Sequence, residues 1–188
     1  IIREDRDHVR EEIRRTHDAG IPLYYIHGNH DNETGNRTLR QGPGIHIGGE
    51  TAVFGDGVVR LSGLDYGAGE FSSPPPEKPG DDGALVSILV IHDTPYPAVD
   101  ENGSPIHRTD PNHLDLREFL DSAEVWLDLV VSGHLHVGSR ASIAGYETPL
   151  IVTGPTAEIG TSTQENVPST WLVTVSEGEV QVERQRLE

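Results

Sequence analysis

The sequence has no cysteine, one lysine and no long apolar run. Without cysteine there is neither a disulfide framework nor a thiolate metal site, so a bound metal must use His, Asn, Asp or Glu, and the redox compartment stays open. No apolar stretch approaches the roughly 20 residues that a membrane-spanning helix needs. We therefore expect no membrane-embedded domain in these 188 residues and a cytoplasmic protein, unless a signal peptide precedes them.

Basic residues are also scarce. The chain has 14 lysines and arginines against 31 aspartates and glutamates, and Lys78 is its single lysine. The net charge of -17 argues against a broad electrostatic footprint for nucleic acid. A carboxylate-rich, lysine-poor surface instead resembles the surfaces of halophilic proteins, in which concentrated salt screens the self-repulsion of the chain. We therefore expect a protein that works in high salt.

The length suits one α/β domain with a real core, so we assign residues 1–188 to a single domain. The charged segment 3–18 predicts a surface helix, and Gly20 and Pro22 supply its stop. Ile1 stands where a start methionine would be, and the chain opens in the middle of a helical pattern. We expect the true start to lie upstream.

Short apolar runs alternate with polar turns along the rest of the chain. They predict strands at 23–26, 52–54, 58–64, 85–91, 127–131, 150–153, 170–175 and 180–184, and a short helix over 114–120. The continuously apolar run 85–91 is typical of a strand covered on both faces. Two long loops are expected, a Pro/Gly-rich one at 67–83 and a polar one from His92 to His113.

In three places an apolar strand leads into a polar cluster that contains histidine. Asn29 and His30 follow the first strand, His92 follows the run 85–91, and His134 and His136 follow the run 127–131. Because ligands in open α/β sheets bind beyond the carboxyl ends of the strands, these side chains can converge. Neutral imidazoles and an amide oxygen suit manganese, iron or zinc.

Each cluster alone also has an ordinary structural interpretation. Gly28 to Asp31 could be a simple turn, and His92 could be a turn residue because Asp93, Thr94 and Pro95 follow it. Two histidines two apart, as in Gly133 to His136, would point to the same side of an extended segment, which favours metal binding. The remaining histidines follow no buried strand; we expect His27 to pack and His8, His17, His46, His107 and His113 to lie on the surface.

Taken in this order, the three clusters resemble the signature of the calcineurin-like metallophosphoesterases, which runs Asp-x-His, Gly-Asp, Gly-Asn-His-Asp/Glu, a lone His and Gly-His-x-His. The resemblance covers about residues 21–188 and implies an α/β fold, a β-sandwich flanked by helices in four αββα layers. It implies two divalent metal ions, with manganese expected and iron or zinc as alternatives. By this resemblance Asn29, His92 and His134 bind one ion and His136 the other, while His30 and Asp31 are catalytic, His30 acting on the leaving group and Asp31 orienting its loop.

The first two blocks of that signature have no counterpart upstream of Gly28. Asp5, Asp7 and His8 imitate a ligand motif only superficially, because no apolar strand precedes them. We therefore expect an N-terminally truncated domain that lacks its first strands and whose missing blocks lie just before Ile1. Such a chain should bind at most one metal firmly and be nearly inactive alone.

The tail is similar to a segment of the SbcD-type nucleases of double-strand-break repair: the run Pro149 to Glu158 is followed by a Ser/Thr-rich stretch, by Glu165 and by the closing strand Trp171-Leu172-Val173. The match is interrupted in the turn Gly154-Pro155-Thr156-Ala157-Glu158, where Ala157 precedes the glutamate. That resemblance implies a phosphodiesterase acting on DNA, an SMC-like ATPase partner, and it allows a homodimer. Two alternatives stay open. One is a phosphatase or phosphodiesterase for a small molecule, and the other is a non-catalytic metal-binding scaffold that docks partners.

The charge balance makes a prediction about stability. Since the Debye length falls from about 30 Å at 0.01 M salt to about 3 Å at 1 M, molar potassium chloride should screen the 31 carboxylates and raise the melting temperature. Thermal unfolding followed by circular dichroism at the two concentrations measures the effect. Equal melting temperatures would remove the halophilic interpretation.

Overall fold

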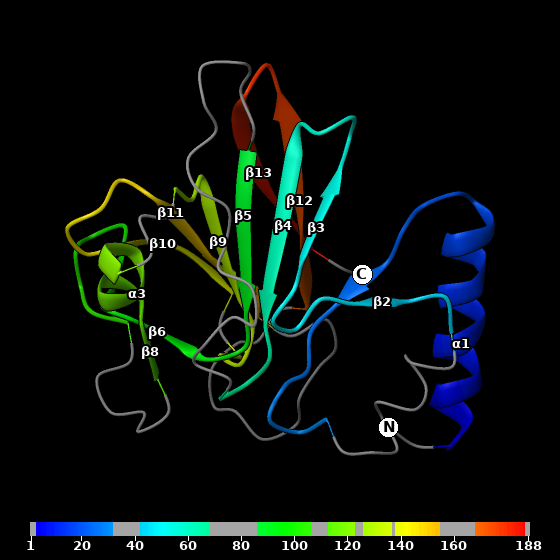
Figure 1. The fold of residues 1–188 in the computed structure, drawn as a ribbon. Helices are drawn as coiled ribbons and strands as arrows, with labels where there is room; N and C mark the ends of the chain where they lie inside the picture. Colours follow the sequence, from blue (N-terminus) through cyan, green and yellow to red (C-terminus); the bar gives the residue numbers. More distant parts are fainter. Residues whose placement is uncertain are drawn as a thin grey trace.

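The computed structural model describes residues 3–31, 42–67, 86–106, 113–122, 126–136, 138–154 and 168–186. Its centre is a seven-stranded mixed sheet (Figure 1). In spatial order the strands are β3 (Thr51–Phe54), β4 (Val59–Leu64), β5 (Val86–Ile91), β9 (Leu129–Ser132), β11 (Pro149–Val152), β10 (Ser139–Ile143) and β7 (Ala98–Asp100). The four strands β4, β5, β9 and β11 run parallel to one another, and the strands outside them pair antiparallel.

The central strand β5 is buried at nearly every position, as its apolar composition predicts. Its side chains alternate between two hydrophobic clusters on opposite faces of the sheet. Leu89 and Ile91 pack on one face with Leu64, and Val86 and Ile88 pack on the other. This alternation fixes the register of β5, because a slip of one residue would exchange the two faces.

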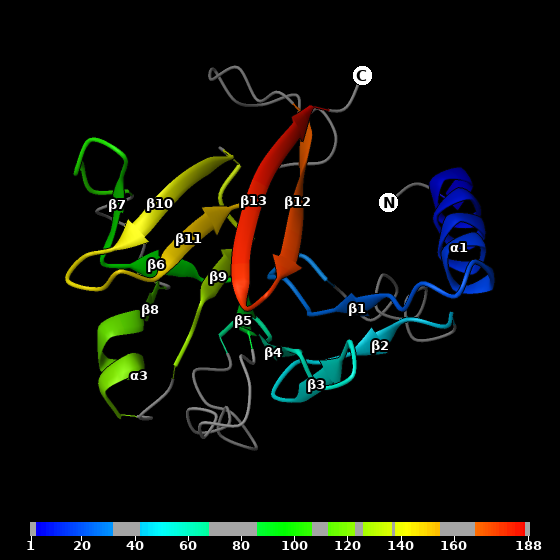
Figure 2. The same ribbon diagram turned by 90° about the horizontal axis from the view of Figure 1, so that it is seen from above.

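Each face of the sheet has its own cover (Figure 2). Helix α3 (Leu116–Ser122) contributes Leu116 and Leu120 to the first cluster. The antiparallel hairpin of β12 (Ser169–Ser176) and β13 (Glu179–Arg186) contributes to the second cluster through alternate apolar residues, among them Trp171 and Val182. A β-layer therefore lies on one side of the sheet and a helix on the other.

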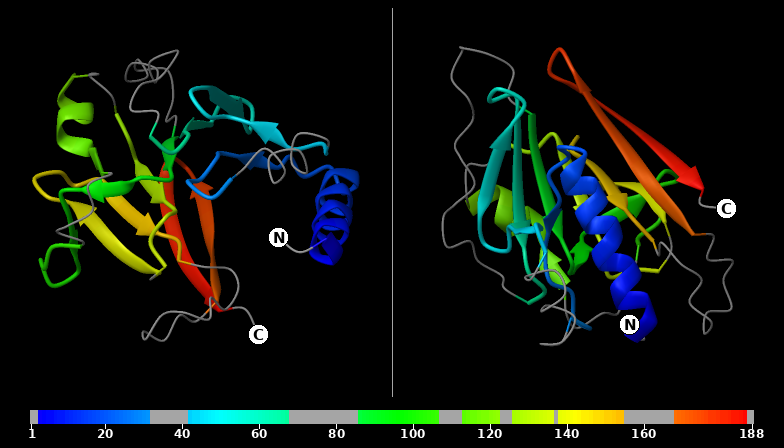
Figure 3. Two further views of the ribbon diagram at one scale, coloured as in Figure 1. Left: turned by 90° about the horizontal axis from the view of Figure 1, so that it is seen from below. Right: turned by 90° about the vertical axis from the view of Figure 1, so that its right-hand side faces the viewer.

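Helix α1 (Arg3–Asp18) lies outermost, beyond the two-stranded parallel sheet of β1 (Tyr24–Tyr25) and β2 (Ile45–His46) (Figures 1 and 3). It ends as expected at Gly20, whose φ is 77°. The Gly20 N–H donates to the His17 carbonyl and the Ile21 N–H to the Thr16 carbonyl, which is the hydrogen-bond pattern of a Schellman cap.

The α/β class and most of the expected strands are confirmed, but the prediction of one long polar loop from His92 to His113 was wrong. Within that stretch β6 (Thr94–Tyr96) and β7 form, and β6 pairs in parallel with β8 (His113–Asp115). Strand β10 was not predicted, and α3 begins two residues later than the expected 114–120 helix. Most of the expected 67–83 loop and residues 155–167 lie outside the described residues. Within the described ranges, neither helix is long and apolar enough to cross a membrane.

Candidate metal centre

His92 and Gly133 stand side by side because the strands that precede them are hydrogen-bonded in parallel. Ile91 of β5 pairs with Ser132 of β9, and the Gly133 N–H donates to the Ile91 carbonyl at 2.9 Å. Both strands stop at this edge of the sheet, so the two polar segments that follow emerge together. The sequence expectation that successive strands deliver histidine to one edge agrees with this arrangement.

The turn from Gly28 to Asp31 brings Asn29 to the same edge. Its backbone is closed by the Asp31 N–H, which donates to the Gly28 carbonyl at 3.1 Å, and by the Gly28 N–H, which donates to Asp31 Oδ2 at 2.6 Å. Asn29 Oδ1 lies 3.1 Å from His92 Nε2. Asp31 therefore shapes the turn, and Asn29 and His92 meet although 63 positions separate them.

His134 joins this pair through an unusual backbone conformation. Its φ is 60°, and the Leu135 N–H donates to the Gly133 carbonyl at 2.6 Å, so residues 133–135 form a tight three-residue turn. The expectation of an extended Gly133–His136 segment was therefore wrong. The turn places the His134 ring edge-on to that of His92, with the centroids 5.5 Å apart. A left-handed non-glycine residue costs on the order of 1–3 kcal/mol and persists where the surrounding structure holds it, often at functional sites.

Two glycines allow the backbone to approach the His92 ring. A Cβ at Gly28 would lie 2.7 Å from His92 Nε2, and a Cβ at Gly133 would lie 2.7 Å from His92 Nδ1. Both distances are far below van der Waals contact. Any other residue at either position would push the imidazole away, so the two glycines hold His92 between two loops.

Burial, and next the charge of His134, lower the pKa of the His92 imidazole below its ordinary 6.5. His30 and His136 act in the same direction, while Asp31 opposes them. All of the residues that the sequence singles out thus lie within electrostatic reach of His92. A lowered pKa keeps His92 neutral near pH 7, which is the form that binds a metal.

Tyr66 was missed by the sequence analysis. Its ring centroid lies 5.6 Å from that of His134 and 6.2 Å from that of His92. The available signal was its position, because Tyr66 comes two residues after the end of β4, which is parallel to β5. Its N–H donates to the His27 carbonyl at 2.9 Å, which ties this loop to the Gly28–Asp31 turn.

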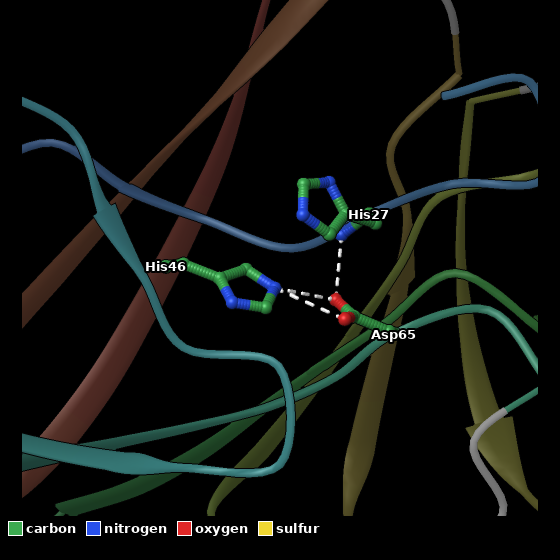
Figure 4. A group of neighbouring side chains, drawn as sticks. All are labelled: His27, His46 and Asp65. Carbon is green, nitrogen blue, oxygen red and sulfur yellow. Dashed lines mark hydrogen bonds and ion pairs between the residues drawn. The ribbon is translucent and has the colours of Figure 1, made fainter. Parts of the chain in front are cut away.

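Beside this centre lies a second group of ligand-type side chains, His27, His46 and Asp65 (Figure 4). The His46 Nε2 lies 3.0 Å from both carboxylate oxygens of Asp65, and the backbone N–H of His27 donates to Asp65 Oδ1 at 2.7 Å. His46, which was expected on the surface, is instead half-buried against Asp65. His27 packs as expected, with its ring centroid 4.3 Å from that of His46.

The other histidines expected on the surface divide into two sets. His17 and His113 are exposed, as predicted. The side chains of His8 and His107 lie outside the described residues.

A hollow of about 380 Å³ near Trp126, Asp128 and Tyr146 lies elsewhere. Trp126 and Asp128 precede β9, so this hollow is at the amino ends of the parallel strands. Ligands of open α/β sheets bind at the opposite edge, where His92 and Gly133 emerge. The hollow is therefore not part of the candidate centre.

No family model matches this chain, and no curated protein matches it. Function is therefore inferred from the residues and their geometry.

The contact between Gly133 and His92 can be tested by adding one methyl group. Gly133→Ala should displace the His92 imidazole and weaken manganese binding about 10–100-fold, as for changes that disturb ligand orientation. Isothermal titration calorimetry measures the affinity. Gly138→Ala is the control, because its Cβ would crowd Arg184, at 2.9 Å from Nη2, instead of His92. Equal manganese affinity in both variants would contradict the assigned role of Gly133.

The lowered pKa of His92 has a sign that can be measured. Because the folded-state pKa lies below the unfolded one, the unfolded state takes up a proton more readily, and stability falls as the pH drops through this range. In the metal-free chain, NMR titration of the imidazole should give a midpoint below 6.5 for His92. In His134→Gln the midpoint should rise, because one repelling charge is gone. A midpoint at or above 6.5 in the unmodified chain would refute this electrostatic account.

Proposed function

We propose that this protein is a metal-dependent phosphoester hydrolase of the calcineurin-like kind, and that its substrate is a phosphodiester, with DNA as the first candidate. The observation that carries the proposal is the meeting of three separate loops at one sheet edge. Asn29 Oδ1 lies 3.1 Å from His92 Nε2, and the His134 ring lies 5.5 Å from that of His92. These are the residues that the sequence resemblance assigns to a single ion.

The residues present fit such an ion. Neighbouring ligands on an octahedral ion with bonds of about 2.1 Å lie about 3.0 Å apart, close to the 3.1 Å between Asn29 Oδ1 and His92 Nε2. His92 is held neutral, and Gly28 and Gly133 leave its ring no room to turn away. Asn29, His92 and His134 would therefore hold one ion, and His136 would contribute to a second. When bound, two such ions supply the positive charge that neutralises a phosphate and acidifies water.

The remaining roles follow from the Gly28–Asp31 turn. His30 is exposed beside Asn29, where it can donate a proton to the leaving oxygen of a phosphoester. Asp31 acts through the backbone, because its carboxylate accepts the Gly28 N–H at 2.6 Å and so fixes the turn that carries Asn29 and His30. Asp31 is thus a positioning residue, and His30 is the catalytic acid.

A net charge of -17 does not preclude a phosphate substrate, since bound cations and not a basic protein face would attract it. The four-layer αββα arrangement is part of the proposal. It is supported by the β12–β13 hairpin on one face of the sheet and α3 on the other. DNA as the substrate, an SMC-like ATPase as the partner and a homodimer rest only on the resemblance of the tail, residues 149–173.

The proposal is tested by turnover of the full-length gene product with manganese. It should hydrolyse a DNA phosphodiester, and His30→Asn should lower the rate about 10²–10⁴-fold, as for loss of an acid-base group, while manganese affinity is retained. His17→Asn is the matched control, because His17 is an exposed histidine of the outlying helix α1. Release of labelled nucleotide gives the rate.

Two outcomes would change the conclusion. Hydrolysis of small phosphomonoesters without any action on DNA would replace the nuclease by a small-molecule phosphatase. Firm metal binding with no turnover of either substrate would favour the non-catalytic scaffold.

A further inference from the structure

We propose that His27, His46 and Asp65 form a separate metal site that takes a zinc-like divalent ion. The three side chains come from segments far apart in the chain: His27 follows β1, His46 belongs to β2, and Asp65 follows β4 (Figure 4). One ligand atom from each lies within 4.8 Å of the other two. This site shares no residue with the proposed phosphoester centre and does not depend on that function.

The spacing of the donors is close to that around a tetrahedral ion. Zinc binds imidazole nitrogen and carboxylate oxygen at about 2.0–2.2 Å, which separates neighbouring donors by about 3.3 Å. His46 Nε2 and the Asp65 oxygens are 3.0 Å apart, so they need only open slightly to admit an ion. The widest separation allowed by the cluster, 4.8 Å, would need to close by about 1.5 Å, which rotation of an imidazole ring can supply.

The carboxylate of Asp65 is already oriented for this role. The backbone N–H of His27 donates to Asp65 Oδ1 at 2.7 Å, and hydrogen bonds of this kind fix the ligating carboxylates of metal sites. A Cβ at Gly48 would lie 2.2 Å from the same oxygen, so the backbone of residue 48 closes one side of the group. The side chains of His46 and Asp65 are 30% and 28% exposed, which leaves a path for an ion to enter.

A simple hydrogen bond between His46 and Asp65 is the competing explanation. It accounts for two of the three groups, but it does not require a second imidazole. The His27 ring lies 4.3 Å from the His46 ring, at an interplanar angle of 32°, and completes a set of two histidines and one carboxylate. Three protein ligands of these types with a position left for water suit zinc, and the same donors also suit iron.

An ion here would brace the neighbouring centre. His27 directly precedes Gly28 and Asn29, and Asp65 directly precedes Tyr66, whose ring contacts His92 and His134. One bound ion would therefore fasten two loops of the candidate centre to β2. This chain would then bind one ion more than the sequence analysis expected.

The test is zinc binding by the metal-stripped 188-residue chain in molar potassium chloride, measured by calorimetry and by the zinc-induced rise in melting temperature. Asp65→Asn keeps an oxygen that can accept the backbone N–H of His27 but loses the negative charge of the carboxylate. His46→Gln removes one imidazole ligand. Each should weaken zinc binding at this site more than 100-fold, beyond the effect of changing a residue that only orients a ligand. His17→Gln is the matched control and should bind zinc like the unmodified chain.

His134→Gln separates the two centres. It should lose the ion of the phosphoester centre and keep the zinc equivalent held by His27, His46 and Asp65. The proposal is overturned if Asp65→Asn and His46→Gln both retain every zinc equivalent and the full zinc-induced stabilisation, or if His134→Gln alone abolishes all binding. Neither result would decide the outcome of the manganese titration of Gly133→Ala or of the turnover measurement on His30→Asn, which test the phosphoester centre.

Discussion

The parallel pairing of β5 with β9 is the constraint on which the candidate metal centre depends. It aligns Ile91 with Ser132, so that His92 and Gly133 leave the sheet at the same edge. The pairing is in turn held by core packing, because Leu89 and Leu129 are fully buried on opposite faces. If either strand slipped by one residue, its side chains would move to the opposite faces of the sheet, and His92 would be separated from its partners. The hydrophobic core therefore sets the geometry of the polar site.

The loops beyond that edge approach the His92 ring closely, and this close approach costs local stability. Gly28 and Gly133 give up side chains where a Cβ would strike the His92 ring, and His134 accepts a left-handed backbone. The His134 conformation costs about 1–3 kcal/mol, and each glycine loses more backbone freedom on folding than another residue would. Burial of a single leucine or isoleucine side chain contributes about 1.5–3 kcal/mol, so the buried strands beneath can support these costs. Such a balance is what a binding site on a rigid sheet requires.

Hydrophobic pattern was enough to predict a strand that is buried on both faces and strands that alternate between apolar and polar positions. The run 85–91 and the terminal hairpin were found because their apolar residues are continuous or alternate cleanly. Strand β10, with the sequence Ser-Arg-Ala-Ser-Ile, was missed because it has few apolar residues and forms only through pairing with β11 and β7. Strands β6 and β7 were read as loop because Pro95 lies within β6 and Pro97 directly precedes β7.

The candidate site, too, could be predicted only in part from the sequence. Asn29, His92 and His134 were identified because each follows an apolar run, and local sequence carries that signal. Asp65 and His46 were missed because neither stands in a recognisable motif, and their meeting depends on tertiary contacts between β2 and the end of β4. The turn at His134 was likewise invisible, since a positive φ at a histidine has no sequence signature comparable with glycine.

The central claim is that Asn29, His92 and His134 share one metal ion. Anomalous diffraction from crystals of this chain grown with manganese, recorded at the manganese edge, tests it most directly. The account predicts a peak about 2.1 Å from Asn29 Oδ1, from His92 Nε2 and from a ring nitrogen of His134. Well-ordered electron density for all three side chains with no anomalous peak between them would contradict it.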